Sequence, residues 1–174
     1  SYALSLWNKC IQLGKDFNIT PYGTEAMHVL RAEKGYIIVG QETDGSVTPV
    51  DLDMNWIVSK KKYDFIGKRA LIRSDTVKED RKQLVGILTV DPSIVLEEGS
   101  QLVEVETSLP MPMVGHITSS YYSPNLGRSI ALALVKSGTK KKGVKLIVPT
   151  VNSSVEVKIT NPVFIDPKNE RLLA

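Results

Sequence analysis

The second half of the 174-residue chain is a series of short apolar runs, and this pattern limits the available folds more than any other feature. The runs are rich in Val, Ile and Leu, and Gly, Pro, Asn and Ser turns separate them. Short strands at such even spacing are typical of a small barrel or a sandwich. The runs cover residues 84–90, 101–106, 113–118, 129–135, 144–148 and 154–159.

The first helix is expected almost at the start of the chain. Leu6, Cys10, Leu13 and Phe17 follow the three-and-four spacing of an amphipathic helix. This spacing predicts a helix packed on its apolar face. Because Cys10 lies in that apolar stripe, we expect a buried small hydrophobic residue there and not a nucleophile. An immediate packed helix and the absence of a starting Met suggest a piece of a longer protein.

A second helix is expected to begin at Thr24, whose hydroxyl would cap it, and to run to about Glu33, where Gly35 would end it. Residues 36–39 are strand-like, and residues 65–73 have the pattern of a third helix. Helices interleaved with strands favour a layered half that mixes both. Residues 75–82 are charged and are the expected linker to the β-rich half.

Composition excludes several classes of protein. The chain has 22 Lys plus Arg against 19 Asp plus Glu, a net charge of +3, which is weak support for nucleic-acid binding. One Cys cannot form an intramolecular disulfide, which favours a reducing, cytoplasmic location. No apolar run approaches the roughly 18 residues of a membrane span. His28 and His116 lack zinc-ligand spacing, so no metal site is expected, and no complete catalytic set is evident.

Glu33 is the strongest candidate for a binding residue. It shares the apolar face of the second helix with Val29 and Leu30, and it lies at the end where unpaired carbonyls repel negative charge. Such a carboxylate needs a donor. A salt bridge to Lys34 or Arg31, or rotation into solvent, would satisfy it. Alternatively, it receives the paired N–H groups of a heterocycle with a guanidine-like edge, such as a pterin.

Residues 59–69 carry five cations, among them Lys62. This density favours a ligand with a carboxylate or phosphate nearby. A solvated loop and helix face would give the same pattern, and both interpretations stay open at this point.

Several stretches resemble the glycine cleavage T-protein (aminomethyltransferase) superfamily over nearly the whole chain. The sequence of residues 40–49 and 60–71 is more similar to that of the α subunits of bacterial heterotetrameric sarcosine oxidases than to that of T-protein itself. The stretches that carry the resemblance are residues 23–35, 40–49, Trp56, 60–71, 114–127, 129–133 and 162–166.

The resemblance implies an α+β chain: the second half of a T-protein-type folate-binding domain in residues 1–80, then a small antiparallel β-barrel in residues 81–174. It also implies that Glu33 binds the amino edge of the pterin ring. T-protein has an Arg at the position of Lys62, where it meets the folate. Lys keeps the charge but loses the bidentate fork. The aspartate that the family places near the reactive folate nitrogen comes from the other half of the domain, so no catalytic residue is expected here.

The activity implied is oxidative demethylation of sarcosine, with transfer of the one-carbon unit to tetrahydrofolate, and the isolated chain would be inactive. FAD, FMN and NAD are expected only in other parts of the parent complex. The implied partners are the N-terminal part of the same α subunit, a flavin-bearing β subunit and the small subunits, with neither nucleic acid nor membrane.

Two other functions remain possible from the sequence. The first is a folate-binding or aminomethyltransferase module that oxidises nothing, similar to T-protein or to the folate domains of dimethylglycine oxidases and dehydrogenases. The second is a basic barrel that binds RNA, although aromatic residues are only 6% of the chain.

Overall fold

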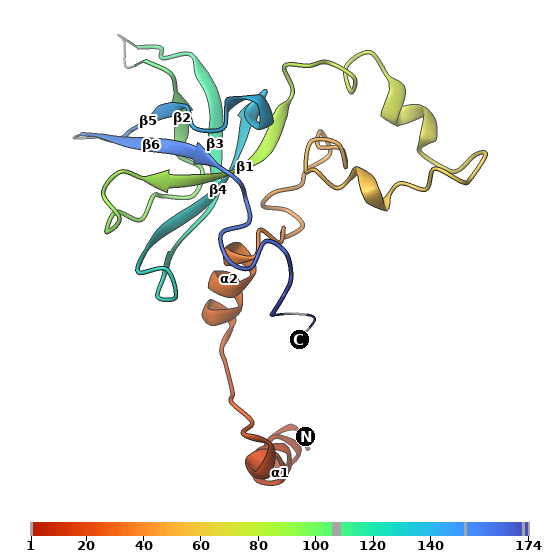
Figure 1. The fold of residues 1–174 in the computed structure, drawn as a ribbon, viewed down its shortest axis with the longest axis vertical. Coiled ribbons are helices and arrows are strands. Elements are labelled where there is room, and N and C mark those ends of the chain that lie inside the picture. Colours follow the sequence, from red (N-terminus) through yellow and green to blue (C-terminus); the bar gives the residue numbers. More distant parts are fainter. Residues whose placement is uncertain (1, 106–108, 152, 172, 174) are drawn as a thin grey trace.

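In the part of the chain that the structure describes, six strands make up most of the second half (Figure 1). The structure, a computed structural model, describes residues 2–105, 109–151, 153–171 and 173. The strands close into a barrel in the order β1-β4-β3-β2-β5-β6, and each neighbouring pair is antiparallel. The predicted small antiparallel barrel is confirmed. The strands are β1 (Lys82–Thr89), β2 (Gln101–Val103), β3 (Met113–Ser123), β4 (Arg128–Lys136), β5 (Lys145–Pro149) and β6 (Ser154–Thr160).

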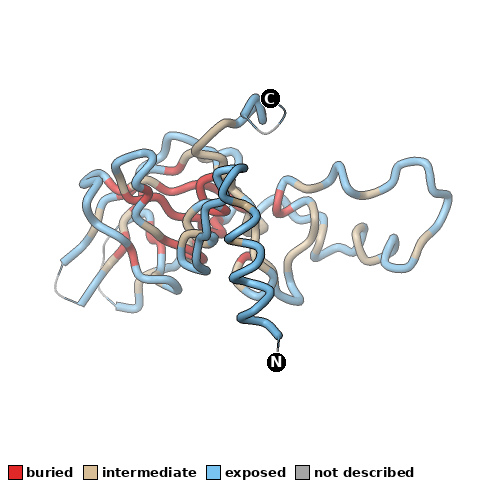
Figure 2. The backbone as a smooth tube through the Cα atoms, turned by 90° about the horizontal axis from the view of Figure 1, so that it is seen from below, coloured by how far each residue is buried: buried red, intermediate tan, exposed pale blue. Residues whose placement is uncertain are grey.

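The barrel holds most of the buried apolar side chains, as the concentration of red in Figure 2 shows. Closure of the sheet pairs β1 with β6, so no strand edge is left open between them. Side chains from several strands therefore form a core within the barrel itself, while β1 and β4 are buried on both faces. Its largest fully buried members include Ile87, Leu102, Ile117, Leu146 and Ile159.

β3 extends beyond the apolar run that predicted it. The run ends at residue 118, whereas the strand continues to Ser123. Ser119, Ser120 and Ser123 are all buried in this extension. Apolar patterning does not detect a strand end whose buried side chains are hydroxyls. The hydroxyls of Ser119 and Ser123 bind polar groups of the first half of the chain, as described below, whereas that of Ser120 accepts the backbone N–H of Leu96.

α2 (Thr24–Glu33) has the bounds that the sequence predicts, and it packs against β3 and β4. Its cap differs from the prediction. Gly23 is the N-cap residue, and no side chain caps the helix, because Thr24 is already its first helical residue. Only the last turn is buried, at Arg31, Ala32 and Glu33.

Gly35 ends α2 and lets the C-terminal segment approach. Its φ of +70° lies in the left-handed region that favours glycine, and a Cβ there would lie 2.6 Å from the carbonyl oxygen of Pro162. Beside this contact, the backbone N–H groups of Phe164 and Ile165 both donate to the Glu33 carbonyl, each at 2.9 Å. The segment after the barrel is therefore fixed against the end of α2.

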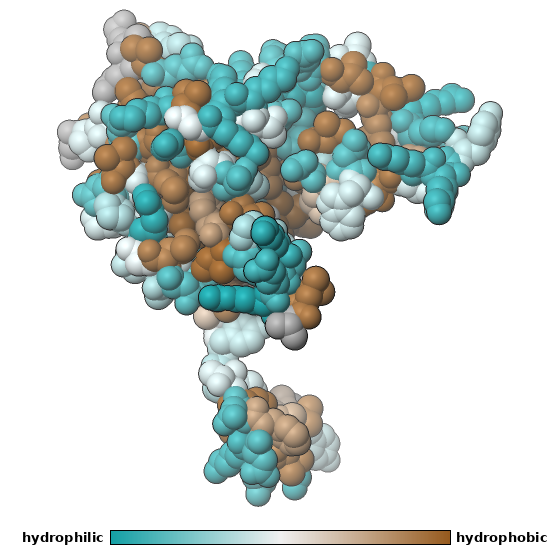
Figure 3. Space-filling model, in the orientation of Figure 1, coloured by the Kyte–Doolittle hydropathy of each residue, from teal (hydrophilic) through white to brown (hydrophobic). Residues whose placement is uncertain are grey.

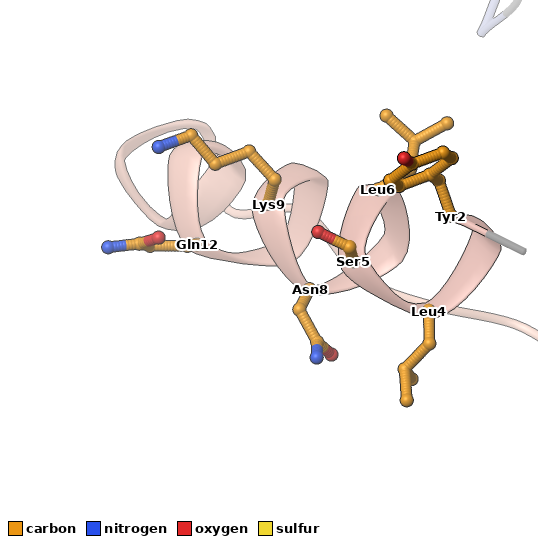
Figure 4. A pocket seen from close by; sticks show the side chains of 7 residues that line it. All are labelled: Tyr2, Leu4, Ser5, Leu6, Asn8, Lys9 and Gln12. Atoms are coloured by element: carbon orange, nitrogen blue, oxygen red, sulfur yellow. The ribbon is translucent and has the colours of Figure 1, made fainter.

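α1 (Ala3–Gly14) lies apart from the barrel, joined to α2 by an extended segment (Figure 1). None of its residues is buried. Cys10 is exposed, so the expected burial of this thiol is wrong. The helix is amphipathic as predicted, and apolar side chains gather on its surface (Figure 3), but no element of the described chain covers them. An open groove on α1 is lined only by Tyr2, Leu4, Ser5, Leu6, Asn8, Lys9 and Gln12 (Figure 4).

Residues 36–81 contain no strand, and the structure describes all of them. The strand expected at residues 36–39 is wrong: Val39 makes one isolated bridge with Thr43, since no neighbouring strand is available to pair with it. The helix expected at residues 65–73 is a short 3₁₀ helix, Lys68–Ile72. Residues 55–80, called the arm below, extend away from the barrel in Figure 1.

Neither α-helix in the described ranges is long and apolar enough to cross a lipid bilayer. The division into domains at residues 80 and 81 stays a prediction.

Candidate functional site

Glu33 is the last residue of α2 and is 3% exposed. The periodicity that placed it on the apolar face of the helix is therefore confirmed, and rotation into solvent is excluded. Its carboxylate is buried at the negative end of the helix dipole, where charge is unfavourable without donors.

Two side chains from the end of β3 and the following turn supply those donors. The Ser123 hydroxyl donates to Glu33 Oε1 at 2.5 Å. The Asn125 amide donates to both oxygens, at 3.1 Å to Oε1 and 2.9 Å to Oε2. Ser123 is completely buried, whereas Asn125 is exposed. The barrel thus completes the environment of a carboxylate that belongs to the first half of the chain.

Neither cation considered as a salt-bridge partner for Glu33 contacts its carboxylate. Arg31 pairs with Glu42 at 3.1 Å, and Lys34 pairs with Asp166 at 3.3 Å. Within the described part of the chain, Glu33 therefore carries a buried carboxylate whose donors are all neutral. This arrangement leaves its negative charge available to a ligand.

A cavity of about 350 Å³ opens beside this carboxylate. Leu30 and Ile165 give it apolar walls, and Tyr36 adds an aromatic ring. Its volume is within the range of small-molecule sites, which combine apolar walls with a few polar groups. The full lining is Leu30, Glu33, Lys34, Tyr36, Asn125, Ile165, Asp166 and Arg171.

A second cavity, of about 410 Å³, lies next to the first, and Lys34 and Tyr36 line both. The walls of this second cavity are mainly apolar and include Leu52 and Trp56. Trp56 belongs to the arm, so the second cavity connects the surroundings of Glu33 with the segment that carries the basic residues.

Lys62 lies on the arm and is exposed. Its backbone N–H donates to the Ser59 hydroxyl at 3.3 Å. Lys62 does not line either cavity, so the structure does not bring it together with Glu33. Its predicted role in binding a cofactor stays a prediction.

Arg31 is the centre of a buried polar network beside the site. It donates to Glu42 at 3.1 Å, to Ser119 at 2.6 Å and to Tyr121 at 3.2 Å. The Ser119 hydroxyl also donates to Glu42, at 2.5 Å. Burial raises the pKa of the Tyr121 hydroxyl, and the nearby Arg31 offsets only part of this effect. The network holds the end of α2 on β3 and thereby fixes the position of Glu33.

Sequence reasoning did not identify Ser123 and Asn125 as site residues. Both lie within residues 114–127, a stretch that carries the family resemblance, but nothing in the local pattern relates them to a helix some 90 positions earlier. The one available signal was the serine-rich end of the β3 run. Hydroxyls at inward positions of a strand indicate a polar partner on the other side.

Two family models match the chain. The GCVT N-terminal domain matches residues 1–62, and the glycine cleavage T-protein C-terminal barrel domain matches residues 82–166.

Named relatives support the same assignment. The chain is 51% identical over 173 residues to the sarcosine oxidase subunit alpha of Corynebacterium sp. (strain P-1), and 39% identical over 174 residues to that of Rhizobium meliloti (strain 1021). Each match covers 98% of this chain and 18% of the relative, so the chain spans about a fifth of the length of these relatives.

More distant relatives are aminomethyltransferases. That of Thermoanaerobacter pseudethanolicus is 30% identical over 165 residues, which is 94% of this chain and 42% of the relative. The crystal structure of aminomethyltransferase T from Bartonella henselae shares the fold with a TM-score of 0.76 at 21% identity, over 91% of this chain and 43% of that one. The sequence matches and the two family models together show that the chain belongs to the glycine cleavage T-protein family.

Proposed function

We propose that the chain forms the folate-binding portion of a sarcosine oxidase α subunit and supports oxidative demethylation of sarcosine. The observation that carries this proposal is the Glu33 carboxylate, which is buried, has only neutral donors and lines a cavity of suitable size. The identity of 51% to a named sarcosine oxidase subunit alpha supports the choice of this activity within the family.

Tetrahydrofolate fits the residues present. The amino edge of its pterin ring has parallel N–H donors, which match a carboxylate that lacks a cation partner. Leu30, Tyr36 and Ile165 would enclose the ring. When bound, tetrahydrofolate supplies the nitrogen that accepts the one-carbon unit.

The chain's own residues then act by holding and sheltering the ligand. Glu33 fixes the orientation of the ring, and the Arg31 network keeps Glu33 in place. The second cavity leads towards the arm, where Lys62 would attract the carboxylates of a longer ligand. Orientation of this kind makes transfer of a group between two bound molecules efficient.

Other parts of the complex would supply the remaining chemistry. Oxidation of the amine requires flavin, which we place on a β subunit. FAD and NAD would be bound elsewhere in the α subunit or its partners. The apolar face of α1, exposed here, is available to the rest of the folate-binding domain. On this proposal the isolated chain has no oxidase activity.

A second candidate is an aminomethyltransferase module without oxidase activity, which the 30% identity and the shared fold support. The two functions differ in peroxide formation. If the full-length protein with its partner subunits produces peroxide from sarcosine, the oxidase is supported. If it transfers an aminomethyl carbon without consuming oxygen, the transferase is supported.

The experiment that tests the site is Glu33→Gln in the full-length protein, with 5-formyltetrahydrofolate binding measured by calorimetry. Gln keeps the shape but loses the charge, so we expect binding to weaken by about 2–4 kcal/mol, the cost of removing one partner of a charge-assisted pair. Glu25→Gln is the matched control, because Glu25 is exposed at the other end of the same helix. Unchanged affinity in Glu33→Gln would contradict the assignment.

A further inference from the structure

A third cavity, of about 230 Å³, lies between residues 44–47 and the strands β1, β3 and β4. None of its lining residues lines either of the two cavities described above. Its volume is below the roughly 300 Å³ at which sites for drug-sized ligands begin, so it suits a small ion. The lining is Asp44, Ser46, Val47, Arg81, Lys82, His116 and Leu134.

The register of the strands places Lys82 and His116 on one face of the sheet. His116 lies opposite Leu134 in the β3–β4 ladder, and Leu134 lies opposite Leu84 in the β1–β4 ladder. Paired residues of neighbouring strands point to the same face, and so do residues two apart on one strand. Lys82 therefore shares the face of His116, and its Nζ lies 3.3 Å from His116 Nδ1.

Lys82 also lies directly opposite Lys136 in the β1–β4 ladder. Like charges at such positions destabilise a sheet. Within the described ranges, neither of these two lysines forms an ion pair with a carboxylate. The barrel has another pair of this kind, Lys145 and Lys158, and there Glu156 binds Lys145 at 2.5 Å. The first pair therefore lacks the counter-charge that the second pair has.

The other charged groups that face the cavity are already bound. Arg81 pairs with Asp51 at 2.6 Å, and Asp44 Oδ1 accepts two hydrogen bonds within its own loop, at 2.7 and 2.6 Å. The Lys82 ammonium has three N–H donors and no acceptor, so the 3.3 Å contact requires His116 Nδ1 to accept. Two donors of Lys82 remain, and the proton of the neutral His116 ring lies on Nε2, where it is a third.

We infer that this cavity binds a small oxyanion, a phosphate or carboxylate group, through the Lys82 ammonium and the His116 ring. The inference goes beyond the proposed function and does not depend on it. An anion at this place relieves the repulsion between Lys82 and Lys136, because it supplies the missing counter-charge. It also joins residues 44–47 of the first region to the barrel.

The site should depend on pH through His116. Burial and, after it, the charge of Lys82 hold the pKa of His116 below its ordinary value of 6.5, and Asp44 offsets only part of this effect. A bound anion favours the protonated ring and therefore raises this pKa. The affinity for an anion should consequently rise as the pH falls through the pKa of the occupied site.

The test uses the full-length protein with its partner subunits and calorimetry at constant ionic strength, because salt screens unspecific binding. Sodium sulfate is the probe for a phosphate-like anion, and sodium acetate is the probe for a carboxylate. Lys82→Met should weaken saturable binding roughly tenfold, the loss expected for a charge-assisted hydrogen bond. Lys158→Met is the matched control, since it removes the same charge from an exposed position of β6, and it should leave binding unchanged.

A second variant, His116→Gln, should weaken binding about threefold and abolish the rise in affinity between about pH 8 and about pH 6. Saturable binding of either probe that depends on Lys82 supports the site, and the probe that binds identifies the anion. If neither probe binds, or if Lys82→Met and Lys158→Met lose equal affinity, the inference is wrong. Thermal melting checks the folding of each variant. Should Lys82→Met fail to fold, an unchanged pH profile in His116→Gln would overturn the inference instead.

Discussion

The barrel and the first 81 residues differ in where their apolar side chains find partners. The barrel covers its own: Leu102 and Ile117 are completely buried by other strands of the same sheet. In the first region, Trp7 is 54% exposed and Trp56 is 78% exposed. Both regions have clear apolar patterns in their sequence. The difference teaches that such a pattern shows which face of an element is suited to burial, but not whether the covering surface belongs to the same chain.

The contacts inside the barrel also differ in kind from the contacts between the two regions. Inside the barrel, apolar contacts dominate, whereas the connection between the regions combines buried polar contacts with an apolar cluster of Leu52, Leu84, Leu132 and Leu134. Arg31 and Glu42 bind Ser119 of β3 in one buried polar link, and the Asp51 carbonyl accepts the Leu84 backbone N–H of β1 at 2.8 Å in another. The Asp51 carboxylate pairs at 2.6 Å with Arg81, the residue just before β1. Stability within the barrel should therefore depend mainly on side-chain volume, and attachment of the first region should depend on charge as well. Three sets of variants test this division.

The largest effect is expected from Arg31→Met, which leaves Glu42 fully buried without its cation. Removal of one partner from a buried ion pair costs about 3–5 kcal/mol. Native-state hydrogen exchange should show this loss at the amides of α2, with a much smaller change in the barrel. The double variant Arg31→Met, Glu42→Gln should recover part of the loss. A loss below about 1 kcal/mol in the single variant would mean that charge does not attach α2 to the barrel.

The next largest effect distinguishes a leucine of the barrel core from a leucine on the exposed face of α1. Leu102→Ala creates a cavity in the barrel core and should lower the free energy of unfolding of the isolated chain by about 2–5 kcal/mol. Leu6→Ala removes a side chain of the same size from the exposed face of α1 and should change it by less than about 0.5 kcal/mol. Urea denaturation measures both. Equal losses would show that α1 packs on the rest of the chain in solution.

The smallest effect concerns pH and the link between Asp51 and Arg81. Burial alone would raise the pKa of Asp51, but hydrogen bonds from Arg81 and Thr48 outweigh it, so the pKa lies below its ordinary value of 3.8. Since the folded-state pKa is depressed, this stabilisation is present above about pH 4 and is lost as the pH falls through the folded pKa.

Asp51→Asn should therefore cost about 1–2 kcal/mol at pH 7 and reduce the loss of stability on acidification below pH 4. Denaturation curves collected from pH 7 down to pH 2 provide the measurement. Asp53→Asn, at an exposed position with a φ of +57° that Asn tolerates, is the control. Parallel acid profiles for the Asp51 variant and the unsubstituted chain would exclude the ion pair as a source of stability.

Sequence patterns predicted those helices and strands whose covering surface belongs to the same chain. All six apolar runs correspond to strands, and α2 has the predicted bounds, because the surfaces that cover them are present. The errors occur where such a partner is missing: Cys10 is exposed, and residues 36–39 find no strand to pair with.

The residues of the candidate site also fall into one that the sequence predicted and two that it did not. Helical spacing and the dipole argument predicted a buried Glu33 that needs donors. They could not supply Ser123 and Asn125, since contacts across 90 or more positions depend on how β3 passes the end of α2.

Glu33 has two separate attachments, and this has a practical consequence for genetics. Its main-chain oxygen holds the C-terminal segment through two backbone N–H groups, while its side chain faces the cavity. A change of side chain leaves the first attachment intact, because every amino acid offers the same carbonyl. A substitution of Glu33 therefore changes the group that faces the cavity and its bonds to Ser123 and Asn125, but it keeps the main-chain anchor of the C-terminal segment, and we expect relatives with another residue at this position to retain that anchor.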